Sequence, residues 1–182
     1  MSIHAAIKRH IKNERLFALQ MTFSSDTISR CVFLSEELRD LLEEQHTARE
    51  SAFRIGRLQA DLEAFAKGEI VSFCFVPFEA GDAFFGKLHR VEEEIWDVRN
   101  RNPKPGIRLF GRFAAQNVFI ASTWFPRSQS WNGKQPLGRR NNPLWEQAKD
   151  LTRKHWNTLF PDHHPLQGTH PDEYVSENGL LV

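Results

Sequence analysis

Arginine recurs at alternate positions in two short runs of β-forming residues, WDVRNR at 96–101 and IRLFGRFA at 107–114. Alternate side chains of a β-strand project from the same face. One face is therefore expected to carry Asp97, Arg99 and Arg101 on the first strand, and Arg108, Phe110 and Arg112 on the second. A guanidinium group stays protonated, matches phosphate with a planar fork of donors, and can stabilise the charge that develops during phosphodiester cleavage. The pattern favours a cationic sheet face that binds an anionic polymer, with RNA as the expected ligand.

Arg99 and Arg108 are expected to lie close together on that face. The apolar residues that alternate with them, and that would face the core, are Trp96, Val98, Ile107 and Leu109. A short turn between the strands would bring the two arginines near each other. Because like charges side by side cost stability, an anion or an acidic protein segment is expected to neutralise them. The alternative is a solvated sheet face on which arginine is simply a good surface residue.

Basic residues are concentrated in one part of the chain. The whole protein has a formal net charge of +1, but residues 97–154 contain twelve Lys or Arg against three Asp or Glu. This asymmetry indicates a basic surface that faces an anionic partner or is covered by the acidic part of the chain itself. The further residues expected to contact RNA are Arg101, Arg112, Lys134, Arg139, Arg140 and Arg153.

Composition is typical of a globular protein. With 182 residues, 40% hydrophobic and 26% charged, the chain suits one domain with an appended arm. Cys31 and Cys74 are expected to be free thiols in a reducing cytosol. The sequence has no signal-peptide pattern and no apolar run of membrane-spanning length, so a soluble cytoplasmic protein is expected.

Neither a metal nor a cofactor is expected. Histidines and acids gather at Asp162-His163-His164 and at His170-Pro171-Asp172, but their spacing matches no zinc template. The sequence contains no glycine loop of the phosphate-binding type. His155 lies at the edge of an apolar helix stripe and is expected to be packed rather than catalytic.

The first third of the chain is expected to be mainly helical. Residues 1–34 would form an arm with a short basic helix and a β-hairpin. Ser35 then caps a helix whose first turn holds Glu36 and Glu37. Residues 35–67 fit either one long helix or a helical hairpin, and the capping box Thr47-x-x-Glu50 favours the hairpin.

Strands are expected at about 69–78, 93–101, 107–114 and 118–125, and the last is apolar on both faces, as in a central strand. A polar loop at 127–142 leads to a closing helix that begins at Asn142 and Pro143. Residues 161–182 are expected to form an irregular tail. Together these elements predict an α+β domain at 35–160, with a small curled antiparallel sheet, an N-terminal helical hairpin and a closing C-terminal helix.

Several short motifs between 84 and 148 occur in an order found in a known family. They are Gly86-Lys87-Leu88, Ile95-Trp96-Asp97-Val98-Arg99, Ile107-Arg108-Leu109-Phe110, Val118-Phe119-Ile120, Arg127, and Asn142-Pro143-Leu144-Trp145-Glu146-Gln147-Ala148. Their arrangement resembles the RelE/ParE toxin superfamily, including its HigB and phage-derived branches. The resemblance implies an mRNA endoribonuclease, free or ribosome-dependent, that an antitoxin inhibits by covering the basic face. It also implies catalytic roles for Arg99, Arg108 and Arg127 at the scissile phosphate. The sequence identifies no general base.

Two other functions fit the same residues. A non-catalytic module could use the basic sheet to bind nucleic acid or an acidic protein. A structural protein could instead cover the Arg99–Arg108 face with acidic residues of its own, which are Glu36, Glu37, Glu43 and Glu44.

Overall fold

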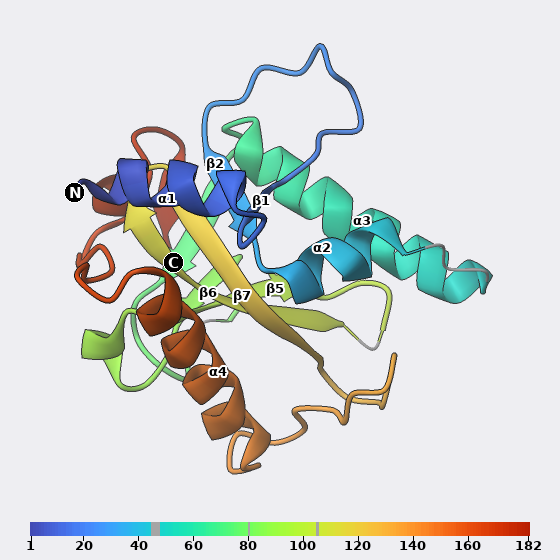
Figure 1. Cartoon of the computed structure of the whole chain (residues 1–182). Coiled ribbons are helices and arrows are strands. Elements are labelled where there is room, and N and C mark those ends of the chain that lie inside the picture. Colours follow the sequence, from blue (N-terminus) through green and yellow to red (C-terminus); the bar gives the residue numbers. More distant parts are fainter. Residues whose placement is uncertain (45–47, 80, 105) are drawn as a thin grey trace.

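A curled, mixed sheet of eight strands forms the centre of the computed structural model, which describes residues 1–44, 48–79, 81–104 and 106–182 (Figure 1). The strands are β1 (Phe17–Ala18), β2 (Cys31–Leu34), β3 (Val71–Cys74), β4 (Phe85–Lys87), β5 (Trp96–Asn100), β6 (Ile107–Ala115), β7 (Val118–Pro126) and β8 (Gly179–Leu181). Their order across the sheet is β1-β2-β7-β6-β5-β4-β3-β8. The longest strands, β6 and β7, therefore lie in the middle, and every residue of β7 is buried, as its apolar sequence predicted.

Helices pack against both faces of this sheet. They are α1 (Ile3–Lys12), α2 (Glu36–Glu43), α3 (Arg49–Ala66), α4 (Leu144–Leu159) and α5 (Pro171–Tyr174), with a short 3-10 helix at Val91–Glu93. The main core lies between α2, α3 and one sheet face, while α4 and α1 pack on the other face of β6 and β7 (Figure 1). Among the described residues, no helix has both the length and the apolar character needed to cross a bilayer.

The antiparallel β5–β6–β7 meander and the two separate helices α2 and α3 agree with the sequence predictions. Ser35 caps α2, as expected, by accepting a hydrogen bond from the Leu38 N–H. The proposed capping box of the next helix includes Thr47, which lies outside the described residues. The α+β class is therefore confirmed.

The prediction of a small, antiparallel sheet was wrong. The sheet has eight strands in the described residues and is mixed, because β2 pairs in parallel with β7, and β3 pairs in parallel with both β4 and β8. Each parallel pair that involves β2 or β8 joins segments far apart in the sequence. Alternation of side chains within one segment carries no information about such pairing.

The segment 161–182 also differs from the irregular tail that its Pro and His content suggested. It forms α5 and then β8, which extends the sheet beyond β3. The physical reason is burial of Tyr174 and Val175, which are 0% and 1% exposed and belong to the main core. Apolar burial of this size outweighs the weak local propensity of the segment.

A buried polar cluster of Lys87, Glu94 and Tyr174 links residues 161–182 to the sheet through hydrogen bonds. The Tyr174 hydroxyl donates to Glu94 Oε2 at 2.6 Å, and Lys87 Nζ donates to Glu94 Oε1 at 2.6 Å. Burial, together with the hydrogen bond to Glu94, raises the pKa of Tyr174. Because each group satisfies another, the three can remain polar inside the core.

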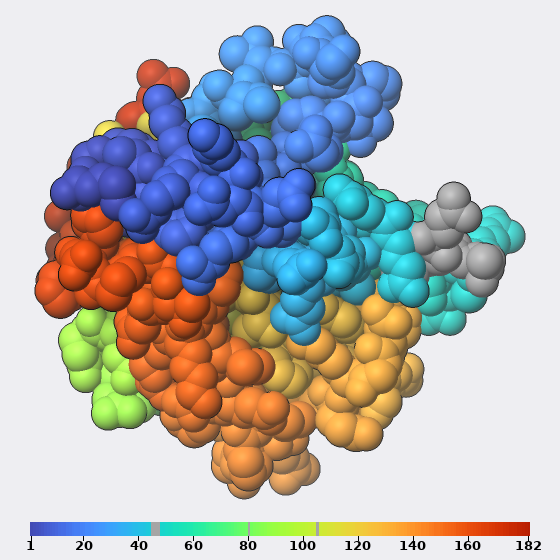
Figure 2. Space-filling model, viewed as in Figure 1, coloured from blue at the N-terminus to red at the C-terminus, as the bar shows by residue number. Residues whose placement is uncertain are grey.

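Two histidines lie where α1 and α4 meet. Figure 2 shows the blue N-terminal residues packed against the orange segment that contains α4. The ring Nε2 of His10 is 2.7 Å from the Leu159 carbonyl oxygen, and the ring Nδ1 of His155 is 2.9 Å from the Ser122 hydroxyl. Burial lowers the pKa of both histidines, that of His155 to about 4. Both rings are therefore neutral in the folded protein at neutral pH, and His155 is half-buried with its ring against the Ser122 hydroxyl, as a packed histidine would be.

We expect acid to destabilise the protein through these histidines. Unfolded His155 takes up a proton near its ordinary pKa of 6.5, whereas the folded form does so only near 4. The stability contributed by the neutral ring is complete above pH 6.5 and is lost as the pH falls towards 4, by up to about 3 kcal/mol. Thermal unfolding between pH 7 and 4 should show a smaller fall in melting temperature for His155→Gln than for the natural protein. His4→Gln, at an exposed histidine of α1, should leave the pH profile unchanged.

Candidate anion-binding site

Arg99 and Arg108 lie close together, as alternation and a short turn predicted, and the register of the β5–β6 pair makes them direct cross-strand partners. Both donate to the same carboxylate, with Asp97 Oδ2 3.1 Å from Arg99 Nε and 3.0 Å from Arg108 Nη1. Asp97 is only 1% exposed. A single buried carboxylate therefore holds two guanidinium groups side by side.

Three further arginines surround this pair. Arg101 follows β5, Arg127 follows β7, and Arg140 comes from the loop before α4. Together with Arg99 and Arg108 they line a cleft of about 510 Å³, which we call the arginine cleft. Its other lining residues are Phe78, Glu79, Gly81, Asp97 and Trp145.

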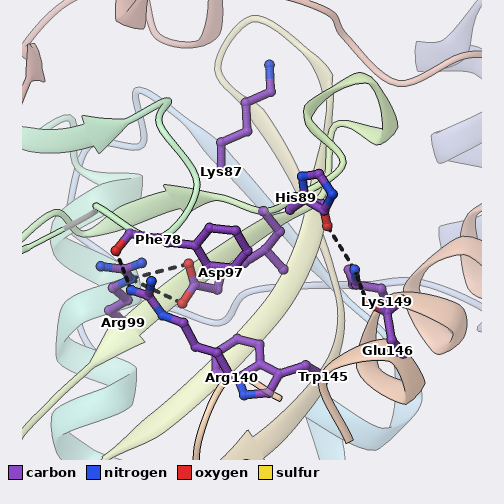
Figure 3. Close-up of a pocket in the computed structure, with 10 residues that line it drawn as sticks. Phe78, Lys87, His89, Asp97, Arg99, Arg140, Trp145, Glu146 and Lys149 are labelled. Carbon is purple, nitrogen blue, oxygen red and sulfur yellow. Dashed lines mark hydrogen bonds and ion pairs between the residues drawn. The ribbon is translucent and has the colours of Figure 1, made fainter. Parts of the chain in front are cut away.

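A smaller cavity of about 100 Å³ adjoins the arginine cleft and shares several of its walls. Its lining adds Lys87, Leu88, His89, Glu146 and Lys149 to residues common to both, which are Phe78, Asp97, Arg99, Arg140 and Trp145. Figure 3 shows Phe78, Asp97, Arg99 and Arg140 converging, whereas the amine of Lys87 points away from them. Lys149 is held on this wall by a 2.8 Å hydrogen bond from its Nζ to the His89 carbonyl oxygen.

The charge in the arginine cleft is positive and only partly compensated. Burial lowers the pKa of Arg108 to about 10, opposed by Asp97 and assisted by the charges of Arg99, Arg127 and Arg101. Arg108 nevertheless remains a cation at neutral pH. Among the described residues, neither Arg127 nor Arg140 has a carboxylate within ion-pair distance. An anion entering the cleft would therefore meet charge that the protein itself leaves unbalanced.

Neutral backbone groups orient several of these arginines. Arg127 Nη1 donates to the Gly138 carbonyl oxygen, and Arg140 Nη2 donates to that of Phe78. Arg101 donates to the Gly81 carbonyl oxygen and to Asp82, whose side chain is 99% exposed. Carbonyl contacts fix the direction of a guanidinium group without cancelling its charge.

Gly86, in β4, allows the Asp97 carboxylate and the Arg99 guanidinium to lie directly over this strand. A Cβ atom at this position would collide with the Asp97 carboxylate and with the Arg99 guanidinium, whose Cζ would be 2.9 Å away. Both collisions involve the groups that form the floor of the cleft. A residue without a side chain is thus required here for close packing.

The structure divides the predicted RNA-contacting residues into two groups. Arg101 and Arg140 line the arginine cleft, and exposed Arg139 neighbours Arg140 in the chain. The residues that do not line the cleft are Arg112, Lys134, Arg139 and Arg153. Lys134 pairs with Glu37, and Arg153 pairs with Glu93 and Asp150.

Arg112 is buried on the same strand as Arg108 but does not reach the cleft. Phe110 lies between them along β6, with the Trp145 ring packed against it at 5.8 Å. The Arg112 guanidinium instead lies 5.8 Å from the centre of the Trp156 ring, and burial lowers its pKa to about 10. An aromatic pair therefore closes the cleft at this end.

The alternative in which acidic helix residues cover the arginine pair is not what the structure shows, since Asp97 from β5 is the carboxylate that pairs with both arginines. Residues of α2 have other partners, with Glu36 and Glu43 near Arg39, and Glu37 bonded to Lys134. Among the described residues, no group of three His, Cys, Asp or Glu side chains is placed to hold a metal ion.

Sequence reasoning missed Phe78, His89 and Trp145, which also line the site. They come from loops and from the start of α4, where no strand periodicity marks them. Trp131, in the loop after β7, packs against Trp124 with ring centres 5.2 Å apart. The aromatic groups at the cleft are therefore Phe78 and Trp145.

Removing the Asp97 charge should destabilise the protein in a way that anions reverse. In Asp97→Asn the two adjacent guanidinium groups lose their shared counter-ion, and we expect the free energy of unfolding to fall by about 3 kcal/mol. Added phosphate should raise the melting temperature of this variant more than that of the natural protein, because it can replace the lost charge. Asp82→Asn, which removes an exposed partner of Arg101, should have little effect. Equal melting temperatures for the two variants would contradict this account of the site.

Comparison with known proteins does not add to this geometry. No family model, no curated protein and no solved structure matches the chain. What the site does must therefore follow from its own residues.

Proposed function

We propose that the arginine cleft binds the phosphate groups of RNA. The observation that carries the proposal is the convergence of five arginines around one cleft. Phosphate offers several acceptor oxygens around one phosphorus atom, and guanidinium groups can approach them from different directions with paired donors. Asp97 keeps Arg99 and Arg108 in place before any ligand arrives, so little orientation has to be achieved on binding.

We further propose that the protein is a toxin-like mRNA endoribonuclease. Arg99, Arg108 and Arg127 would hold the scissile phosphate while the adjacent 2′-hydroxyl attacks phosphorus and the bond from phosphorus to the 5′-oxygen breaks, with that oxygen taking a proton from water. The products would be a 2′,3′-cyclic phosphate and a 5′-hydroxyl. Cations held within a partly buried cleft can stabilise the extra negative charge of the transition state. The motif resemblance to the RelE/ParE superfamily supports the same reaction.

His89 is the group we propose to accept the proton from the 2′-hydroxyl. It lines the smaller cavity together with Arg99 and Arg140, and its ring centre is 6.0 Å from that of Phe78. Imidazole is the side chain that most often performs such transfers in enzymes. An antitoxin would block this reaction by placing an acidic segment in the arginine cleft.

A second candidate function is RNA binding without cleavage. It is favoured by the composition of the cleft, in which arginines outnumber groups able to exchange protons near neutral pH. The acidic group at its centre, Asp97, is already engaged by two guanidinium groups. The two functions share one binding mode and differ in whether RNA is cut.

RNA binding should depend on Arg108 and on salt. We expect Arg108→Ala to weaken binding of a fluorescent RNA oligonucleotide about tenfold at low salt, and to reduce the slope of log affinity against log salt by about one. Fluorescence anisotropy at several salt concentrations would measure both. Lys8→Ala removes an exposed charge from α1, far from the cleft in sequence and fold, and should change neither. Affinity that does not respond to salt would refute phosphate binding.

Expression of the protein alone should arrest bacterial growth if it cleaves mRNA. Arg108→Ala should restore growth, because it removes a cation from the scissile phosphate, and His89→Ala should do so without abolishing RNA binding. RNA from arrested cells should carry new 2′,3′-cyclic phosphate ends. Normal growth with abundant, folded natural protein would exclude the endoribonuclease and leave the binding function.

A further inference from the structure

Phe78 combines two properties that are unusual for a phenylalanine. Its side chain is 58% exposed, and its backbone has a φ of 77°, in the left-handed region. A bulky residue in this conformation is strained, and strained residues concentrate at functional sites. Since the ring gains little from burial, packing in the core does not account for its place.

The ring lies on the wall that the arginine cleft shares with the smaller cavity (Figure 3). Arg140 donates to the Phe78 carbonyl oxygen, and its guanidinium carbon is 4.9 Å from the centre of the ring. The His89 ring is on the same wall, tilted by 35° to Phe78. An exposed aromatic surface thus adjoins the cluster of cations.

The other aromatic residues near the cleft pack against further rings, whereas the neighbours of the Phe78 ring are Arg140 and the His89 side chain. Trp145 is half-buried and packs against Phe110, and Trp131 packs against Trp124. More than half of the Phe78 surface remains accessible. Phe78 is therefore the ring best placed to meet a flat group attached to a bound phosphate.

We propose that Phe78 stacks on an unpaired nucleobase, which makes single-stranded RNA the substrate class of the arginine cleft. The inference rests on the proposed binding of RNA phosphate there. A base presents a flat face that an aromatic ring can cover, and this contact is tolerant of sequence. In a duplex the base faces are stacked on one another and are not available. Phosphate in the cleft and base on Phe78 together select a single strand.

The test compares Phe78→Ala with the natural protein on three short ligands. These are single-stranded RNA, an abasic RNA strand with the same number of phosphates, and an RNA duplex. We expect Phe78→Ala to weaken binding of the single strand about tenfold, as loss of one stacked base would. Binding of the abasic strand should not change, because it makes only phosphate contacts. Phe78→Trp should keep the affinity for the single strand, since it retains an aromatic face.

The outcomes separate this inference from the function on which it rests. Absence of binding to all three ligands would refute RNA binding itself. Equal affinity of the natural protein for the normal and abasic strands, with both weakened by Arg108→Ala, would overturn stacking and leave the phosphate site intact. A loss in Phe78→Trp as large as in Phe78→Ala would also overturn it. Circular dichroism of each variant checks that the fold is kept, as expected for an exposed side chain.

Discussion

Mutual repulsion between closely spaced cations is the constraint on which the centre of this structure depends. Arg99 and Arg108 are neighbours on the adjacent strands β5 and β6, and the carboxylate of Asp97 offsets their repulsion by pairing with both. Asp97 can reach both because it lies two residues before Arg99 on the same face of β5. Gly86 then leaves room above β4 for the Asp97 carboxylate and the Arg99 guanidinium. The cationic site is thus built from the sheet itself, while its remaining walls are supplied by loops and α4.

Local patterns predicted that the two arginines would lie near each other and predicted the β5–β6–β7 meander, because each depends on residues near one another in sequence. The separation of α2 from α3 was favoured by a capping signal, since the apolar pattern alone also fitted one long helix. Local patterns could not predict the parallel pairing of β2 and β8, which depends on contacts between distant segments. Arg112 was predicted to lie on the same face of its strand as Arg108. It does not line the cleft, because Trp145 packs on Phe110, which lies between the two arginines along β6. Phe78 and His89 were missed because loops have no repeating pattern, although an exposed aromatic beside a cationic cleft is informative once the fold is known.

The site has a strong anion-binding character and a weaker acid–base character. Its cations are numerous, converge from four separate segments and are oriented largely by carbonyl groups, which preserve their charge. Preorganised positive charge of this kind serves binding and transition-state stabilisation equally. The difference between a binding protein and a nuclease therefore depends on proton transfer, the role that we propose for His89.

The C-terminal segment has a bearing on how the chain reaches its folded state. Tyr174 completes the cluster around Glu94, and β8 gives β3 its outer neighbour. A nascent chain that stops short of these residues leaves Lys87 and Glu94 without the tyrosine hydroxyl and exposes an apolar strand edge. Such edges attract other chains and proteases. Loss of α5 and β8 would therefore uncover the edge of β3 and part of the main core at the same time.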